Sequence, residues 1–419
     1  MDQINKSKKI LKILPWYMGI SYGLLFYTPI STLFFTIAKN LSLSQITMLG
    51  TISTIISIIS QPFILKIMKK IGNTYSVRIG AFMLLISVLC ITFGNFYIIM
   101  LGFILESIAF VFNDMINIIL RNNLKFLNKD NEYIKYKNKS FLLYSVLTAI
   151  IALLASYLFN LNHYLPMFFC AGSCIIISLM SLFINDVKLL STEEIEEKSN
   201  FSKIIPKSNT IFNIILFFGI IRACIALEFS NTELFIQDNL KTFFDITNTT
   251  YYFGIIIFIS RIVRIISNII FNKVYIKFRE KLIYILPILL LISFILLIFS
   301  YYLISNLLIK FSIMGFAYAI IVVLIDSFNA VIQDAILRNS NSEEHQSALT
   351  YLSLSYKIFK AIFGFCISLI LLKYSLIYVL IFLIILVLMG IVQFRKTYLK
   401  LSWFIKNMIY QFHIYLVQL

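Results

Sequence analysis

Residues 60–78 read SQPFILKIMKKIGNTYSVR, a short polar stretch between two long apolar segments. Its charged residues are all basic, namely Lys66, Lys69, Lys70 and Arg78. The flanking segments, near residues 45–66 and 76–94, are each long enough to cross a hydrocarbon layer of roughly 30 Å as a helix. The stretch is therefore typical of a positively charged loop that joins two transmembrane helices on the cytoplasmic side.

The same alternation of apolar and basic segments extends over the whole chain. Of the 419 residues 60% are hydrophobic and only 13% are charged, which is too little polar surface to enclose a soluble core. This composition excludes a soluble enzyme and favours an all-α integral membrane protein. Runs of about 20 apolar residues predict twelve spans. These lie near residues 13–37, 45–66, 76–94, 97–119, 141–160, 164–184, 210–230, 249–271, 282–302, 306–330, 346–371 and 375–394.

The basic residues are distributed unevenly between alternate loops. On the side opposite the N-terminus the predicted loops hold only Lys39, Lys241 and Lys373, whereas most of the 36 Lys and Arg residues lie on the other side. Because cytoplasmic loops accumulate Lys and Arg, we expect both termini to be cytoplasmic and the protein to cross the cell membrane many times. The net charge of +17 then reflects topology and contact with the anionic lipid bilayer, not a nucleic-acid partner.

A polar segment at residues 185–209 divides the predicted spans into six plus six. Residues 1–184 and 210–394 are therefore predicted to form two six-helix bundles joined by a cytoplasmic linker. Similar sequences stand at the ends of the fourth and tenth predicted spans, namely ILRNN at residues 119–123 and ILRNS at residues 336–340. Their equivalent positions support a duplication of the chain. The tail, residues 395–419, mixes aromatic and basic residues and is expected to lie along the cytoplasmic headgroups, with a thirteenth crossing as the alternative.

The loop at residues 60–78 resembles the corresponding loop of the major facilitator superfamily. Gln61, Pro62, Lys70 and Gly72 match the family pattern, whereas Lys69 stands where an Asp is expected. The resemblance implies a secondary transporter of two six-helix bundles that works as a monomer. It also implies a gating role for Gln61, Pro62, Lys69, Lys70, Gly72 and Arg78. In the family this Asp takes part in a charged contact that holds the two halves together on the cytoplasmic side. Because Lys69 replaces it here, one alternative is a receptor or partner subunit that does not transport.

A narrower resemblance is to the lactose-permease branch of that superfamily. The stretches 131–133 and 347–352 and the sequence around His163 are similar to that branch. The branch's proton-coupling His and Glu have no counterpart on the tenth span, and Arg261 stands about where a sugar-binding acidic residue would be. A proton-coupled symporter of a sugar or another neutral solute is therefore the second alternative.

Two ionisable residues lie near the middle of predicted spans, where a charge is costly and tends to serve transport. Glu106 lies about ten residues into the fourth span, and Arg222 about thirteen residues into the seventh. A desolvated carboxyl group can gain and lose a proton at physiological pH. Glu106 is therefore the candidate for coupling to a proton or another ion, and Arg222 is a candidate for binding substrate.

Two further pairs of basic residues share helical faces because each pair is spaced i, i+3. Arg261 and Arg264 lie on the eighth span, and Lys357 and Lys360 lie on the eleventh. Together with Arg222 they predict a basic site for a small organic anion or zwitterion, which Tyr22 and Tyr27 could line. The alternative is structural: Asp326 neutralises Lys357 or Lys360, and the tyrosines mark the membrane interface. The sequence contains no ATPase motif, and its five scattered cysteines fit no metal site, so no cofactor is expected.

Overall fold

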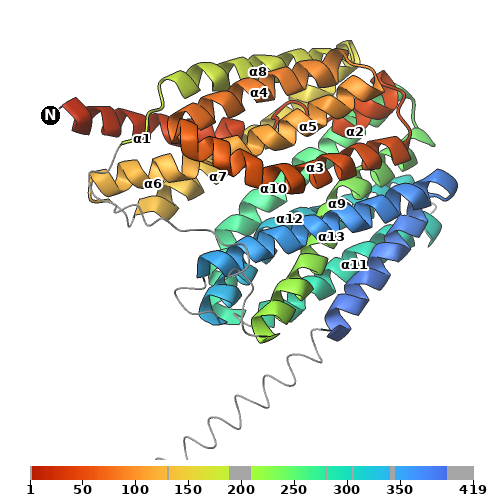
Figure 1. Cartoon of the computed structure of the whole chain (residues 1–419). Coiled ribbons are helices and arrows are strands. Elements are labelled where there is room, and N and C mark those ends of the chain that lie inside the picture. Colours follow the sequence, from red (N-terminus) through yellow and green to blue (C-terminus); the bar gives the residue numbers. More distant parts are fainter. Residues whose placement is uncertain are drawn as a thin grey trace, which may run out of the picture. The chain divides into compact units, whose positions relative to one another are not determined.

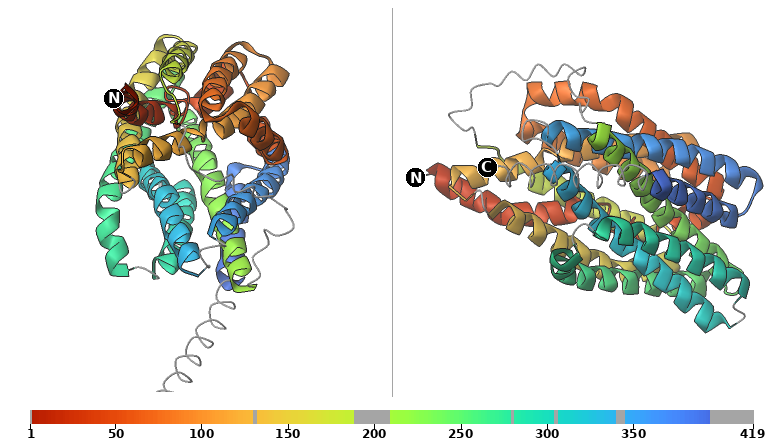
Figure 2. Two further views of the ribbon diagram at one scale, coloured as in Figure 1. Left: turned by 60° about the vertical axis from the view of Figure 1, so that its left-hand side comes forward. Right: turned by 90° about the horizontal axis from the view of Figure 1, so that it is seen from below.

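A computed structural model of the chain describes residues 2–129, 132–187, 209–278, 281–303, 306–339 and 345–393. The described elements are helices joined by short connections, as Figures 1 and 2 show from three directions. Most of the predicted linker and nearly all of the predicted interfacial tail, 395–419, lie outside the described residues.

Eleven helical segments of the described chain are long and apolar enough to cross a membrane. This confirms the prediction of an all-α, multi-pass membrane protein, although the predicted count of twelve spans is not reached. The helices are α3 (Leu43–Ile71), α4 (Asn73–Phe93), α5 (Phe96–Asn113) continued by α6 (Ile116–Phe126), α7 (Tyr133–Leu161), α8 (Leu165–Leu182), α9 (Asn209–Lys241), α10 (Ile246–Phe278), α11 (Leu282–Leu303), α12 (Leu307–Asn339), α13 (His345–Lys373) and a last segment, Leu376–Gln393.

The first predicted span, near 13–37, is a broken helix. Helix α1 (Asp2–Ser21) ends in a series of turns over residues 22–30, after which α2 (Ser31–Leu33) continues as a short π-helix, η1 (Phe34–Ala38). Gly23 weakens the helix, and Pro29 has no N–H to donate and crowds the preceding turn. A hydropathy count cannot detect this interruption, because the residues at the break are as apolar as their neighbours.

The seventh predicted span ends too early at residue 230, because α9 continues to Lys241. Its additional turns contain polar residues that lie buried inside the protein: Asn231, Thr232, Glu233, Gln237 and Asn239. The hydropathy pattern treats polar residues as a sign that the chain has left the membrane. Here the polar side chains face other helices, where hydrogen bonds can offset the cost of burial.

The described helices form two compact units. Unit 1 combines residues 1–197, 232–269 and 364–372, whereas unit 2 combines residues 198–231, 270–363 and 373–419. Within unit 1, α4 packs between α5 and α8, and α1 lies beside α6 and α7. A cluster of buried apolar side chains from α1, α4, α6 and α8 fills the space between them, and Leu14, Tyr17 and Leu120 are among its fully buried members. The predicted division of the chain into 1–184 and 210–394 remains a prediction.

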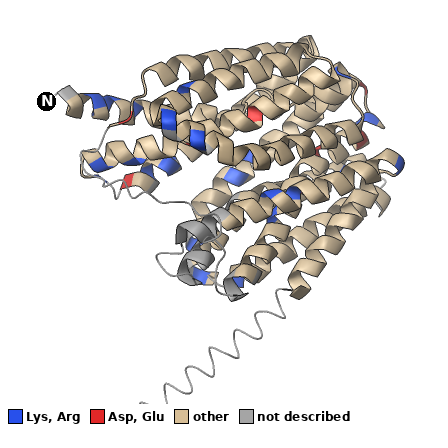
Figure 3. Ribbon diagram, in the orientation of Figure 1, with Lys and Arg blue, Asp and Glu red and all other residues tan. Residues whose placement is uncertain are grey.

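The stretch predicted as a gating loop is mostly helical. Gln61 and Pro62 lie inside α3, which extends to Ile71, and the turn to α4 is made by Gly72 alone. Gly72 has a φ of 80°, a conformation that other residues rarely adopt. Lys70 is exposed, and the Lys69 side chain lies outside the described part. Figure 3 shows Lys and Arg gathered at this end of unit 1.

At the same end of unit 1, a carboxylate that the sequence did not single out connects the end of α8 to α4 and α6. Asp186, just after α8, accepts hydrogen bonds from Asn73 Nδ2 at 2.7 Å and from Asn122 Nδ2 at 3.0 Å. Its own N–H donates to Thr74 Oγ1 at 2.9 Å. The predicted gating residue Arg78 donates to the carbonyl oxygen of Leu182 at 3.1 Å and so links α4 to the end of α8.

Candidate functional site

Within unit 2, three of the predicted substrate-binding cations lie around one tyrosine. The guanidinium of Arg222, on α9, lies 4.6 Å from the ring centroid of Tyr356 on α13 and acts electrostatically on its hydroxyl group. Lys357 and Lys360 are close enough to act electrostatically on the same hydroxyl. We call Arg222, Tyr356, Lys357 and Lys360 the basic cluster. Asp326, the predicted neutralising partner of the lysines, has a side chain outside the described part.

A close approach of two helices positions the basic cluster. A Cβ atom added to Gly219 would come within 3.1 Å of Ser355 Cβ, so the absence of a side chain lets α13 approach α9. Ser355 Oγ also donates to the Ile215 carbonyl oxygen at 3.2 Å. Gly219 lies within one turn of Arg222 and Ser355 is next to Tyr356, so these contacts hold the guanidinium against the ring.

Within unit 1, a second tyrosine joins two more predicted site residues. Tyr144, on α7, makes an edge contact with the Tyr22 ring at a centroid distance of 5.0 Å. The guanidinium of Arg264 lies 5.9 Å from the Tyr144 ring centroid on the other helix, α10. Arg261 and Arg264 are both buried, with 2% and 6% of their surface exposed. Tyr144, which the sequence did not identify, thus contacts both Tyr22 and Arg264.

Helices α7 and α10 run along one another and so bring Tyr144 to Arg264. Asn160 Nδ2, near the end of α7, donates to the Thr247 carbonyl oxygen at the start of α10 at 3.2 Å. Further along, a Cβ atom at Gly254 would come within 2.7 Å of Ser156 Cβ. The two helices are therefore antiparallel and in direct contact where Gly254 has no side chain.

The third predicted site residue of unit 1, Tyr27, has an acidic environment. It lies in the break of the first span, is 9% exposed, and its ring contacts Phe35 at a centroid distance of 5.9 Å. Two carboxylates act electrostatically on its hydroxyl group, Glu106 from α5 and Glu233 from α9. The predicted coupling residue, Glu106, is therefore close enough to the Tyr27 hydroxyl group to act on it, and so is Glu233.

Three site residues that the sequence did not single out are Tyr356, Tyr144 and Glu233. A signal for Tyr356 was present, because it stands one helical turn before Lys360 and next to Lys357. Glu233 was missed because the seventh span was predicted to end at residue 230. Tyr144 has no comparable signal, since only the packing of α7 against α10 brings it to Arg264.

The fold of the chain is similar to that of known proteins. Residues 13–336 match the model of the family described as Major Facilitator Superfamily. A crystal structure of the nucleoside transporter NupG superimposes with a TM-score of 0.70 at 13% identity, over 93% of this chain and 99% of that one. A bacterial homologue of the human lysosomal transporter Spinster, inward-facing and unoccupied, gives 0.66 at 11% identity, over 94% and 98%. No curated protein sequence matches the chain.

Proposed function

We propose that this chain, which belongs to the Major Facilitator Superfamily, is a secondary active transporter that carries a small organic anion or zwitterion across the cell membrane. Membership of the family supports transport by alternating access between two sides of the membrane. The substrate class and the coupling ion are inferred from the residues of this chain.

The observation that carries the substrate class is the basic cluster of unit 2. Arg222 lies against the Tyr356 ring, and Lys357 and Lys360 act electrostatically on the same hydroxyl group; like charges in one region of a protein interior repel one another. A carboxylate or phosphate would relieve that repulsion, and a guanidinium can bind either of them through two parallel hydrogen bonds. The cluster therefore favours an anionic group on the substrate.

For coupling we propose Glu106, on the basis of its place within a span and its action on the Tyr27 hydroxyl group. A carboxyl group inside a membrane span has its charged form disfavoured, so it is suited to carrying a proton through the transport cycle. Glu106→Gln should then abolish flux driven by a pH gradient, because glutamine cannot carry the proton. Persistent pH-driven flux in Glu106→Gln would remove this residue from the coupling role.

The test of the substrate class is uptake by proteoliposomes with an imposed pH gradient. Panels of labelled organic anions, zwitterions and neutral solutes would be compared for the wild type, Arg222→Ala and Arg222→Lys. The control variant is Arg121→Ala, which removes an exposed arginine on α6. We expect selective uptake of anions or zwitterions, with KM raised about 10- to 100-fold in Arg222→Ala because a charge-assisted contact is lost.

Two other outcomes would each replace the proposal by one of its alternatives. Uptake of neutral solutes that is indifferent to Arg222→Ala would indicate a proton-coupled symporter of sugars or similar solutes. Absence of gradient-driven uptake for every panel, with correctly folded protein in the vesicles, would indicate a transport-inactive receptor or partner subunit.

A further inference from the structure

The carboxyl group of Glu228 lies deep inside unit 2. Glu228 stands about halfway along the span Ile214–Lys241, and Ser293 stands about halfway along the span Leu282–Tyr302. Both side chains are fully buried, with 0% of their surface exposed. Ser293 Oγ, on α11, lies 3.4 Å from Glu228 Oε1, on α9. The carboxyl group therefore faces α11 at a depth that is far from water on either side of the membrane, where a charge is costly.

The hydrogen bonds of Ser293 restrict the charge of this carboxyl group. A serine hydroxyl has one proton and therefore donates to one acceptor at a time. Ser293 Oγ lies 2.7 Å from the Leu290 carbonyl oxygen, an ordinary length for such a bond, whereas its 3.4 Å separation from Glu228 Oε1 is longer than usual. Ser293 therefore donates its proton to Leu290, and the lone pairs of its oxygen are left to face Glu228.

An ionised Glu228 would have no donor at either oxygen. Its Oε1 atom would meet the lone pairs of Ser293, and its Oε2 atom has no hydrogen-bond partner in the described part of the chain. A buried carboxylate without a donor is strongly unfavourable. A neutral carboxylic acid fits the same atoms, because its O–H group can donate to Ser293 Oγ and its carbonyl oxygen carries no full charge.

The titratable groups around Glu228 lie on α9, α12 and α13. One turn earlier on α9, Cys224 is close enough for Glu228 to act on it electrostatically. The next residue, Phe229, stacks on the Tyr318 ring of α12 at a centroid distance of 5.6 Å. Thiols and phenols are ordinarily neutral at physiological pH, so neither supplies a counter-ion. The remaining charged groups are those of the basic cluster on α9 and α13, and among the described residues none of them is hydrogen-bonded to Glu228.

The place of Glu228 on the same helix as Arg222 gives its proton a consequence for an anion. Arg222 lies six residues earlier on α9, which is about 9 Å along the helix axis. Inside a protein, a negative charge on Glu228 at such a distance weakens the attraction of the basic cluster for an anion, and a neutral Glu228 restores it. By linkage, binding of an anion favours protonation of Glu228, and departure of the anion favours loss of the proton.

We propose that Glu228 is held as a neutral carboxylic acid and that its proton crosses the membrane together with an anionic substrate. The first part stands on the geometry of Glu228 and Ser293 alone, whereas the second part rests on the proposed function. Glu228 is then a proton carrier of unit 2, in addition to Glu106, the candidate of unit 1. Because the proton and the anion are bound together and released together, both move in the same direction.

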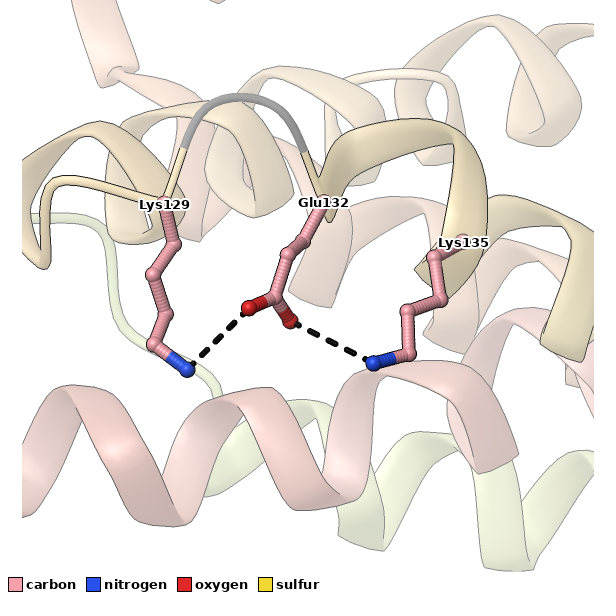
Figure 4. A network of polar contacts seen from close by, with 3 residues as sticks. All are labelled: Lys129, Glu132 and Lys135. Atoms are coloured by element: carbon pink, nitrogen blue, oxygen red, sulfur yellow. Dashed lines mark hydrogen bonds and ion pairs between the residues drawn. The ribbon is translucent and has the colours of Figure 1, made fainter.

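The first part is tested by infrared spectroscopy of the purified full-length protein in lipid at neutral pH. A protonated carboxyl group has a carbonyl band that an ionised carboxylate lacks. We expect Glu228→Gln to remove such a band and to keep the fold, because glutamine has nearly the same size and its N–H can donate to Ser293 Oγ. Glu132→Gln is the matched control and should remove no such band, because this carboxylate lies 3.3 Å from Lys129 Nζ and 3.8 Å from Lys135 Nζ (Figure 4). An unchanged band in Glu228→Gln would overturn the proposal.

Two further measurements test the contact with Ser293 and the absence of a bound cation. In Ser293→Ala the band of Glu228 should remain but shift in frequency, because its O–H group loses the acceptor. An unshifted band would overturn the hydrogen bond from which the neutral acid is inferred. Na⁺ is also titrated into the protein, with binding read as a rise in the unfolding temperature. A rise in the wild type that is lost in Glu228→Gln would show an ionised carboxylate that holds a cation, and would overturn the proposal as well.

The second part is tested in proteoliposomes with the labelled anion of the panel that the wild type takes up best. Glu228→Gln should lose uptake driven by a pH gradient, because glutamine cannot release a proton. It should retain exchange of labelled for unlabelled anion, which needs no net movement of protons. Surviving pH-driven uptake, or loss of exchange in correctly folded protein, would overturn this part. If the wild type takes up no solute of the panel, the proposed function fails, whereas the infrared bands still decide whether Glu228 is a neutral acid.

Discussion

At Tyr356 one phenol lies beside three cations, and this residue links the predicted site residues of unit 2. Its ring lies 4.6 Å from the Arg222 guanidinium, which also acts electrostatically on its hydroxyl group. The ring offers a face for the cation, and the hydroxyl sets the direction in which the guanidinium points. Tyr356 is therefore expected to orient Arg222 for binding an anionic group.

Tyr356→Phe separates these two contributions, because it keeps the ring and removes only the hydroxyl. We expect KM for the anionic substrate to rise about tenfold, since the polar group on which the Arg222 guanidinium acts is lost. The measurement is uptake in proteoliposomes with the unfolding temperature as a control for folding. An unchanged KM would show that the hydroxyl does not orient Arg222.

Asp186 is a second residue whose partners define its role. Its carboxylate accepts from Asn73 at 2.7 Å and from Asn122 at 3.0 Å and so holds the start of α4 to α6. Asp186→Ala should lower the free energy of unfolding by about 1–3 kcal/mol, because both amides lose their acceptor. Thermal unfolding in detergent measures this, with Asp238→Ala as the control at an exposed acidic residue of α9. Equal effects of the two variants would contradict the assignment.

Among the elements, the broken first span differs most from its predicted form. Backbone groups within a membrane need partners inside the protein, so an interruption is tolerated where other helices surround it. The turns at residues 22–30 contain Tyr22 and Tyr27, and α5, α7 and α9 each bring a site residue to them: Glu106, Tyr144 and Glu233. The break is therefore where several helices of unit 1 meet the first span.

The contact of α7 with α10 depends on one glycine. Because a Cβ atom at Gly254 would lie 2.7 Å from Ser156 Cβ, Gly254→Ala should force the two helices apart and destabilise the protein by about 1–3 kcal/mol. Ser156→Gly in the same chain should restore much of this loss, because it removes the clashing atom. The control is Gly50→Ala in α3, where a Cβ atom would meet nothing within 4 Å. Equal destabilisation by Gly50→Ala and Gly254→Ala, measured by thermal unfolding, would refute this account.

For the whole molecule, the uneven distribution of Lys and Arg predicts the orientation in the membrane. Thr242, between α9 and α10, and Lys129, after α6, are both exposed and belong to loops of opposite predicted sides. In a chain freed of its own cysteines, Thr242→Cys should react with a membrane-impermeant maleimide on intact cells. Lys129→Cys should react only after the cells are permeabilised. The reverse pattern would place both termini outside.

The composition and the order of charges were enough to predict the class of this protein. Membrane insertion depends on hydrophobicity summed over about 20 residues, and orientation depends on counts of Lys and Arg, so both can be read along the chain. The family could also be predicted, from Gln61, Pro62 and Gly72 in a short motif. The basic residues of the site, Arg222, Lys357 and Lys360, were found because a charge inside an apolar run is conspicuous.

What only the tertiary structure decided is which side chains meet. Arg222 lies against Tyr356, Arg264 lies against Tyr144, and Glu106 and Glu233 both act on Tyr27, and in each case the residues come from different helices. Their proximity depends on where two helices approach closely, as at Gly219 and Gly254, and on where a helix breaks. Hydrophobicity is a sum over neighbouring residues and is visible in the sequence. A contact between helices depends on the packing of whole elements, and it exists only once the chain has folded.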